Sequence, residues 1–273
     1  MIDHNIMTSN KPAAYEGFSR AAADYDEVSI ANHIVQRLRE RAQRRMLLHW
    51  RVGDHVLELN CGTGADALFL AQHGINVLAT DISPAMIART KEKIRRERLE
   101  SLAHTRVLAF DELPSLTGMQ FTGALSMFGG LNCAEDIEKV FHDVAQLLRP
   151  GGTFIASFLG KYSMWETLAY LSRAHFRTAF RRWRATPLYA NVYDIKVPTR
   201  YWSEKKLENL VQTHFSVQRI EAWSVISPPP ASLRFLREHK KLCALLFSAE
   251  EAIAHVFPFN RLGDHVVLEL KKK

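Results

Sequence analysis

Short apolar runs alternate with longer amphipathic segments along the first 160 residues of the chain. The runs have the length and the uninterrupted apolar character of buried strands. They lie at 55–59, 76–81, 105–110, 123–129 and 153–160. The segments between them place apolar residues at helical spacing, and they lie at 64–74, 83–99 and 134–152. Strands that alternate with helices pair in parallel through right-handed crossovers. The pattern therefore predicts a doubly wound α/β sheet.

The pattern changes after residue 160, where longer and less regular segments follow. We expect helices over 164–183, 203–215 and 231–256, and strands over 216–226 and 265–270. The predicted fold is a Rossmann-like, seven-stranded sheet, mostly parallel with an antiparallel last strand, with helices on both faces and an inserted helical lid. We expect a single domain over 1–273. Its parts are a helical N-terminal cap at about 12–50 and lid insertions at about 161–200 and 228–262.

Composition narrows the class of protein without giving its function. Hydrophobic residues make up 47% and charged residues 24% of the chain, as in ordinary globular domains. No apolar run approaches the ~18 residues of a membrane span, and the polar N-terminus lacks the apolar core of a signal peptide. The three cysteines are widely spaced and form no metal-binding pair. We therefore expect a cytoplasmic protein with reduced thiols and no metal, whose oligomeric state the sequence leaves open.

The formal net charge of +7 permits acidic partners such as nucleic acid, anionic lipid or an acidic substrate. Much of this charge falls in two short segments, 37–45 and 91–98. We interpret both segments as solvated helix faces, because charges at such spacing usually face water. The net charge alone therefore selects no partner.

A glycine-rich loop between the first two predicted strands is the main chemical signal. Gly62 and Gly64 belong to a G-x-G-x-x-A pattern, and Asp81 follows at the spacing of an acid that binds a ribose. A nicotinamide or flavin dinucleotide would suit this pattern. Glu58, however, ends the strand before the loop, where a carboxylate repels a pyrophosphate and attracts an ammonium or sulfonium group. The loop leaves two cofactor classes open, and Glu58 favours the cationic one.

Five stretches, taken in order, resemble the motifs of a known family. They are VLELNCGTG (56–64), VLATDISPAMI (77–87), LAFDELP (108–114), SMFGGLNC (126–133) and LLRPGGTF (147–154). Over about residues 25–160 the chain resembles the class I S-adenosylmethionine-dependent methyltransferases. It is most similar to their small-molecule branch, such as quinone C-methyltransferases and malonyl carrier-protein O-methyltransferases. The resemblance implies S-adenosylmethionine as cofactor and in-line methyl transfer to a small-molecule, lipid-like or acidic acceptor.

The resemblance and side-chain chemistry together give a set of candidate cofactor-binding residues. They are Tyr25, Glu58, Asn60, Cys61, Gly62, Gly64, Asp81, Ile82, Met86, Asp111, Glu112 and Met127. Backbone N–H groups of the glycine loop, at a helix N-terminus, suit the cofactor's carboxylate. Glu58 suits the amino group, and Asp81 can accept both ribose hydroxyls. We expect Ile82 and Met86 to enclose the adenine, with Asp111 and the backbone near Glu112 at its amino edge.

Three positions depend more directly on the family likeness. Tyr25 resembles the family's N-terminal tyrosine that closes over the cofactor, with plain helix packing as the alternative. Met127, with Phe128, ends the fourth predicted strand, where ligands of parallel sheets bind, and is expected near the sulfonium. Asn60 stands where the family usually has glycine, although asparagine tolerates a positive φ better than most residues.

The acceptor site is less well defined by the sequence. Candidate substrate residues are Phe128, Asn132, Tyr189, Tyr201, Arg177 and Arg181. The segment 172–184 carries five arginines among aromatic residues and no acid, which suits an acidic or amphipathic substrate, or docking on anionic lipid. The alternative is a solvated helix whose aromatic residues pack on the domain. His265, next to Asp264, is a weak candidate for a general base, with a structural histidine as the alternative because strand neighbours point to opposite faces.

Other functions compete with a small-molecule methyltransferase. Enzymes of this fold that methylate the amino groups of DNA or RNA bases usually carry an Asn/Asp-Pro-Pro-aromatic motif after the fourth strand. This chain has FGGLNC there, at 128–133, which argues against that chemistry, while a basic surface leaves tRNA or rRNA open. A nicotinamide-dependent oxidoreductase is a further alternative, and a noncatalytic cofactor-binding protein is another. We expect no obligate nucleic-acid partner.

Overall fold

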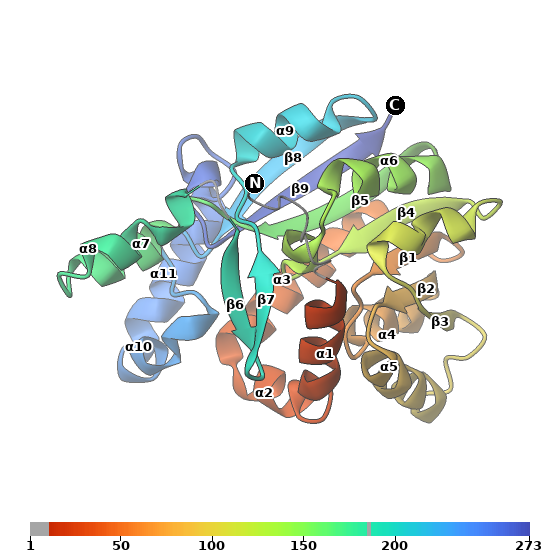
Figure 1. Cartoon of the computed structure of the whole chain (residues 1–273), viewed down its shortest axis with the longest axis horizontal. Coiled ribbons are helices and arrows are strands. Elements are labelled where there is room, and N and C mark those ends of the chain that lie inside the picture. The colour runs from red at the N-terminus through yellow and green to blue at the C-terminus, as the bar shows by residue number, and fades with distance from the viewer. Residues whose placement is uncertain (1–10, 185–186) are drawn as a thin grey trace, which may run out of the picture.

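A seven-stranded sheet forms the centre of the computed structural model, which describes residues 11–184 and 187–273. The strand order is β3-β2-β1-β4-β5-β9-β8 (Figure 1). In chain order the strands are β1 (His55–Leu59), β2 (Asn76–Asp81), β3 (Ala103–Val107), β4 (Phe121–Ser126), β5 (Leu148–Leu159), β8 (Phe215–Trp223) and β9 (His265–Lys272). The first five pair in parallel, and β9 runs antiparallel to both β5 and β8. The predicted sheet is confirmed.

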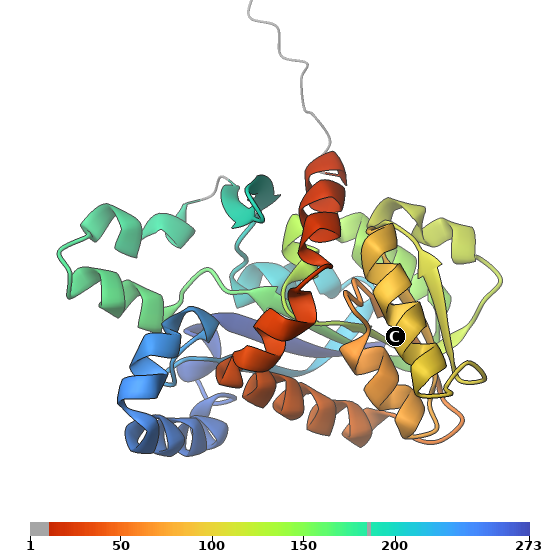
Figure 2. The ribbon, with the colours of Figure 1, turned by 90° about the horizontal axis from the view of Figure 1, so that it is seen from below.

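Helices cover both faces of the sheet (Figure 2). One layer holds α3 (His33–His49), α4 (Ala65–Gln72), α5 (Pro84–Arg96) and α11 (Lys240–Ile253), and the other holds α6 (Ile137–Leu147) and α9 (Glu204–Val211). Under α6, the rings of Phe141, Phe154 and Phe215 pack with centroids 6.0–6.3 Å apart. Each such buried side chain stabilises the fold by roughly 1.5–3 kcal/mol, so this core holds the sheet rigidly beneath the site.

The segment between β5 and β8 differs from the prediction in two ways. The single helix expected over 164–183 is wrong: the structure has α7 (Met164–Leu171), α8 (Phe176–Ala179) and the 3-10 turn η3 (Arg181–Trp183). The chain breaks between α7 and α8, where Ala174 has a φ of 57°. A hairpin of β6 (Leu188–Val192) and β7 (Ile195–Thr199) follows, and it was not expected. Its turn residues, Tyr193 and Asp194, both have positive φ, as a tight hairpin turn requires.

Other boundaries shift by smaller amounts. The third strand ends at Val107, three residues before its expected end, because its pairing with β2 stops there and the 3-10 helix η1 (Phe110–Leu116) begins. The stretch 231–256 forms α10 (Leu233–Glu238) and α11, which are separated at His239, instead of one helix. Short 3-10 turns complete the chain: η2 (Gly130–Cys133), η4 (Pro230–Ser232) and η5 (Phe259–Arg261).

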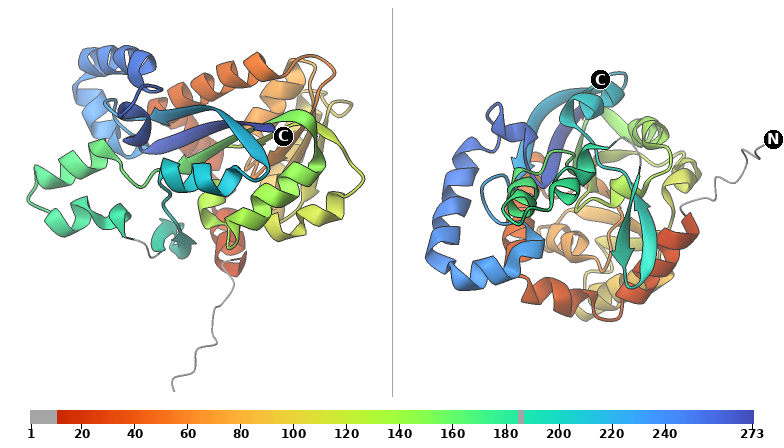
Figure 3. Two further views of the ribbon diagram at one scale, coloured as in Figure 1. Left: turned by 90° about the horizontal axis from the view of Figure 1, so that it is seen from above. Right: turned by 60° about the vertical axis from the view of Figure 1, so that its left-hand side comes forward.

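The N-terminal helix α1 (Lys11–Ala21) packs against the β6–β7 hairpin (Figure 3), and α2 (Tyr25–Ala31) packs against α3. Gly17 permits this close approach, since a Cβ there would lie 3.3 Å from both Val192 and Val197. The Tyr193 hydroxyl also donates a hydrogen bond to Asp24. We call residues 11–31 and 188–199 the roof, because they cover the carboxyl ends of the strands.

Two elements extend away from the central layers. Figures 2 and 3 show α7 and α8 projecting from one end of the molecule. Within the described residues, no helix combines the length and the apolar character that crossing a bilayer demands. Nor do the described residues bring together three histidine, cysteine, aspartate or glutamate side chains able to hold a metal ion.

Candidate functional site

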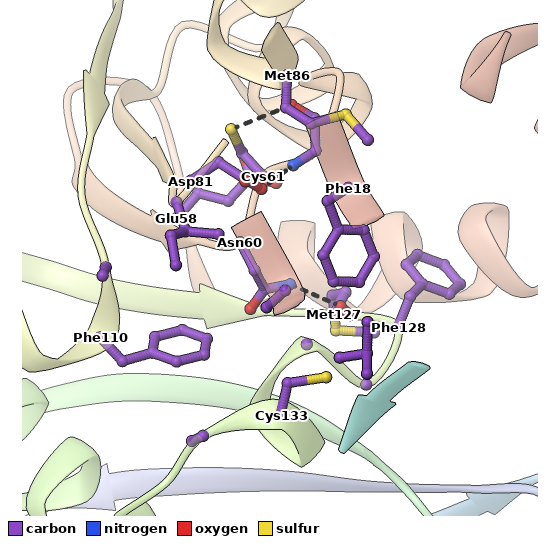
Figure 4. A pocket seen from close by; sticks show the side chains of 18 of the residues that line it. Phe18, Glu58, Asn60, Cys61, Asp81, Met86, Phe110, Met127, Phe128 and Cys133 are labelled. Carbon is purple, nitrogen blue, oxygen red and sulfur yellow. Dashed lines mark hydrogen bonds between the residues drawn. The ribbon is translucent and has the colours of Figure 1, made fainter. Parts of the chain in front are cut away.

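A cavity of about 520 Å³ lies beneath the roof, at the carboxyl ends of β1, β2 and β4. In a doubly wound sheet this is where neighbouring strands connect to helices on opposite faces, which leaves a crevice above the strand ends. Most predicted cofactor residues line it: Tyr25, Glu58, Asn60, Cys61, Gly62, Asp81, Ile82, Met86, Asp111 and Met127. Figure 4 shows Glu58 and Asp81 close together, with Met127 and Phe128 on another wall.

The loop after β1 owes its shape to three residues with positive φ. Asn60, Gly62 and Gly64 have φ values of 49°, 56° and 78°. The amide of Asn60 donates a hydrogen bond of 3.0 Å to the carbonyl of Met127, so this departure from the family pattern ties the loop to the end of β4. Gly64 lies outside the cavity lining; a Cβ there would lie 2.4 Å from the side chain of Thr90. Gly64 therefore allows α4 to pack on α5.

Three acidic side chains surround this loop, and two of them are already paired. Asp66 binds Arg39 at 2.7 Å and Gln43 at 3.2 Å. Asp81 accepts hydrogen bonds from the backbone N–H groups of Gly62 and Ser83, each at 2.9 Å. Burial raises the pKa of Asp81 despite these two donors. Each oxygen of Asp81 keeps a lone pair that can accept a ligand hydroxyl.

Glu58 is the exception among these acids. It is 3% exposed, and its Oε2 has no hydrogen-bond partner within the part of the chain that the structure describes. Burial, reinforced by the nearby Asp66 and Asp81, raises the pKa of Glu58 well above its ordinary value, although Arg39 opposes the shift. A buried carboxylate oxygen without a partner is costly. The arrangement therefore fits a ligand that brings a cationic hydrogen-bond donor to Glu58.

The far wall comes from the turns after β3 and β4. Phe110 and Asp111 begin η1, and the carboxylate of Glu112 accepts a hydrogen bond of 2.8 Å from the backbone of Ala109. Glu112 thus shapes this turn from outside the cavity lining. Phe128 has a φ of 59°, and it turns the chain away from the sheet immediately after Met127.

The structure adds lining residues that the sequence did not suggest: Phe18, Arg39, Thr63, Asp66, Phe110 and Cys133. Arg39 lies in the segment 37–45, which we interpreted as a solvated face. That interpretation is wrong for Arg39, Arg41 and Arg45, whose side chains are 11–21% exposed and pair with buried acids. Arginines occur on more than one side of this helix, so the sequence did not indicate which of them face the domain.

A second cavity, of about 1390 Å³, adjoins the first and shares Phe18, Tyr25, Arg39 and Phe128 with it. Its apolar walls include Met164 and Trp165 of α7 and Phe235 of α10. The two cavities therefore adjoin on the carboxyl side of the sheet, and the shared side chains lie between them.

A buried ion cluster lies on the wall of this second cavity. Arg182 contacts Glu166 at 2.5 Å and Asp264 at 2.8 Å, and Nδ1 of His265 lies 3.1 Å from Asp264. Burial alone would raise the pKa of Asp264, but Arg182 and His265 hold it well below its ordinary value. This approach of Nδ1 is an ion-pair distance without hydrogen-bond geometry, because Nδ1 of His265 has no hydrogen-bond partner among the described residues. The expectation that these two side chains point to opposite faces is wrong, because Asp264 precedes β9, which begins at His265. Arg181 joins the cluster through Glu166, at 2.7 Å.

The remaining substrate candidates lie elsewhere. Asn132 clamps the backbone, accepting from the N–H of Leu159 at 2.8 Å and donating to the carbonyl of Arg200 at 2.6 Å. Tyr189 is 68% exposed, and Tyr201 lies beneath the guanidinium of Arg182, 4.7 Å from its ring centre. Both tyrosines, Asn132 and Arg177 lie outside the lining of the two cavities.

Comparison with known proteins agrees with this geometry. A family model described as a methyltransferase domain matches residues 56–152. The demethylmenaquinone methyltransferase of Tropheryma whipplei (strain Twist) is 28% identical over 154 residues, which make up 56% of this chain and 62% of that protein. The S-adenosyl-L-methionine-dependent Diels-Alderase iccD of Talaromyces variabilis is 29% identical over 122 residues, 42% of this chain and 41% of that protein. The chain thus spans less than two thirds of the length of these curated relatives.

Solved structures extend the likeness to nearly the whole chain. The [4+2]-cyclase SpnF superposes with a TM-score of 0.65 at 15% identity, over 97% of each chain. The N-methyltransferase NodS from Bradyrhizobium japonicum, solved with S-adenosyl-L-homocysteine, gives 0.58 at 14% identity over 95% of this chain and 98% of that one. At sequence identities this low, the superpositions show a shared fold only. Residues 56–152 therefore match a methyltransferase domain, and the chain has the fold of the class I S-adenosylmethionine-dependent methyltransferases.

Proposed function

We propose that this chain is an S-adenosylmethionine-dependent methyltransferase that acts on a small molecule. The observation that carries the proposal is the unpartnered, buried oxygen of Glu58 beside the glycine loop. The cofactor's amino group would satisfy that oxygen, and backbone N–H groups at the start of α4 would hold its carboxylate. A dinucleotide would instead bring a pyrophosphate toward Glu58, and like charges repel strongly in a buried setting.

The rest of the first cavity fits the remaining parts of the cofactor. Asp81 would accept the two ribose hydroxyls with the lone pairs that its backbone donors leave free. Ile82, Met86 and Phe110 offer apolar surface for the adenine, with Asp111 at the edge of the same region. Tyr25 would close the cavity from the roof. These assignments extend the sequence predictions, and Phe110 is an addition to them.

When bound, S-adenosylmethionine supplies a methyl group already activated by its sulfonium. The protein then has to position the acceptor in line with that methyl group and exclude water, which can account for most of the rate enhancement. Phe128, which lines both cavities, and Met127, which lines the first, would orient the reacting atoms. The roof excludes solvent from the cofactor side, because Phe18 and Tyr25 cover the cavity there.

The second cavity is our proposed acceptor site, and its size and lining indicate an amphipathic acceptor. Apolar walls from α7 and α10 suit a hydrocarbon or aromatic portion, whereas Arg181 and the rim residue Arg173 suit an acidic group. His265 is the proposed general base for an acceptor that keeps its proton at neutral pH. Asp264 lies 3.1 Å from Nδ1 of the imidazole. A small rotation of the ring would let Asp264 accept a hydrogen bond from the N–H at Nδ1, and Nε2 would then take the proton.

Calorimetry tests cofactor binding, and mass spectrometry tests methyl transfer. We expect micromolar or tighter binding of S-adenosylhomocysteine and no binding of reduced nicotinamide dinucleotide; the reverse result would refute the proposal. Binding alone is insufficient evidence, because two of the similar proteins are named as a Diels-Alderase and a [4+2]-cyclase. Cofactor carrying a trideuterated methyl group, incubated with protein and a metabolite extract, should yield products that carry the label.

The base assignment has its own test once an acceptor is known. His265→Ala should lower kcat by roughly 100-fold or more and remove the lower pH limb of the rate profile. His73, which is exposed on the far side of α4, gives a control, because His73→Ala should leave kcat unchanged. An unchanged pH profile in the His265 variant would assign this histidine to structure.

A further inference from the structure

The segment 172–184, which we call the arginine arm, carries five arginines and no acid. The structure divides these arginines into two groups. Arg181 and Arg182 turn inward and pair with Glu166. The other three, Arg173, Arg177 and Arg184, are exposed, and no ion pair links them to another described residue. The outer surface of the arm therefore has uncompensated positive charge.

Large apolar side chains share this exposed surface. Phe176, Phe180 and Trp183 are 63%, 40% and 46% exposed. Phe180 and Trp183 pack edge to face, with ring centroids 5.0 Å apart. The helix before the arm, α7, buries none of its residues, and α8 buries only Ala179. Trp183 also packs edge to face on Tyr162, outside the arm, with ring centroids 5.2 Å apart. The domain therefore holds one end of this aromatic surface, while Phe176 stays largely exposed. The expected alternative was a solvated helix whose aromatic residues pack on the domain. The segment is not one helix, and of its three large aromatic residues Trp183 does contact a ring outside the arm.

We propose that the arginine arm docks on the surface of a membrane that contains anionic lipid. Aromatic rings prefer the boundary between head groups and acyl chains, and arginines beside them can bind lipid phosphates through paired N–H groups. Each basic residue near an anionic membrane surface adds about 1 kcal/mol of attraction. The backbone of α8 projects with α7 from one end of the molecule, so this end can approach a flat surface (Figures 2 and 3).

The shape of the arm favours lipid over other partners. Single-stranded nucleic acid is held in grooves that follow several successive phosphates, whereas this arm is a short projection. A second copy of the chain would need an acidic surface opposite three unpaired arginines. The proposal is independent of the proposed function. It would, however, bring the second cavity to the lipid, because Leu168 and Arg173 belong to both α7–α8 and the cavity lining.

Co-sedimentation of the full chain with vesicles tests this proposal. We compare phosphatidylcholine vesicles with vesicles containing about 30% phosphatidylglycerol, at about 0.15 M salt, where screening limits nonspecific attraction. We expect binding to the anionic vesicles to be at least about tenfold stronger than to the neutral ones. The double variant Arg177→Glu/Arg184→Glu should bind the anionic vesicles about tenfold or more weakly than the wild type does. Phe176→Ser/Phe180→Ser should lower it without a change of charge.

A control with the same charge change separates the arm from net charge. Lys91 and Arg95 are exposed on α5, and the variant Lys91→Glu/Arg95→Glu should keep binding within about twofold. Circular dichroism and S-adenosylhomocysteine affinity verify that each variant is folded. Equal loss in the arm and α5 variants would overturn the proposal. The proposal would also be overturned if the wild type bound single-stranded RNA but not vesicles, and if only the arm variant lost the RNA binding. A dimer of the wild type, detected by light scattering, that only the arm variant dissociates would overturn it as well.

Discussion

Replacing Glu58 with glutamine should stabilise the free protein while weakening cofactor binding. The substitution keeps the shape of the side chain and removes its charge. In the folded protein, burial and the neighbouring Asp66 raise the pKa of Glu58 above its ordinary value of 4.5. When folding raises the pKa of an acid, the acid loses its proton at a lower pH in the unfolded state than in the folded state. Its cost to the fold is therefore absent below about pH 4.5 and grows as the pH rises toward the folded pKa.

The magnitude follows from the unpartnered oxygen. An unsatisfied buried polar group costs about 1–3 kcal/mol, and the glutamine amide recovers only part of this because it brings unsatisfied donors of its own. We expect a gain of about 1 kcal/mol at neutral pH, which raises the melting temperature by about 2–4 °C in a chain of this size. Loss of a charge-assisted hydrogen bond costs about 1.5–3 kcal/mol of binding free energy. Affinity for S-adenosylhomocysteine should fall roughly 10- to 150-fold.

Calorimetric melting between pH 4.5 and 8 measures the first effect, and isothermal titration measures the second. The melting temperatures of Glu58→Gln and the wild type should converge at the acid end and separate as the pH rises. Glu100→Gln is the control, because Glu100 is exposed and should change neither quantity. A variant that melts below the wild type at pH 7.5, or that binds the ligand with wild-type affinity, would refute the reasoning.

Three further predictions follow from the same site. Asp81→Ala should weaken S-adenosylhomocysteine binding by at least about 100-fold in calorimetry, through loss of two ribose contacts, with an unchanged circular dichroism spectrum. Gly64→Ala should destabilise the fold by about 2–5 kcal/mol in urea titration, since its Cβ would meet Thr90 at 2.4 Å; Gly53→Ala, with a similar φ and open space, should cost only about 1–2 kcal/mol. Asp26→Asn should loosen α2 from the glycine loop and weaken binding by up to about fivefold. Burial alone would raise the pKa of Asp26, but its hydrogen bonds lower it from 3.8 on balance, so the wild-type advantage should persist above that pH and disappear below it.

The sheet and the floor of the site could be predicted because their signals are local. The bounds of β1 and β2 match the apolar runs at 55–59 and 76–81. The glycine loop follows the first run, and the helix cap Ser83 follows the second. Glu58 and Asp81 fall at adjacent strand ends, so parallel pairing brings them together without further information. The parallel pairing of the first strands thus follows from a repeated pattern of short strands and capped helices.

The roof and the arm could not be predicted because their signals depend on contacts distant in sequence. The hairpin turn at Tyr193-Asp194 lacks the glycine or asparagine that usually marks such a turn. Ala174 adopts a left-handed conformation that its residue type does not favour, so nothing local indicated where the helix would break. Arg39 became part of the site only because α3 turns that face toward Asp66 and Phe128.

The roof joins the first described helices to a hairpin far along the chain: Asp24 and Tyr193 are 169 positions apart. Closing a loop of that length costs conformational entropy before any contact is gained. During synthesis α1 leaves the ribosome long before its partner, the β6–β7 hairpin, exists. The sheet from β1 to β5 needs neither of them. We therefore expect the central sheet to form first and the capacity to hold a nucleoside to mature last, when the two distant segments meet.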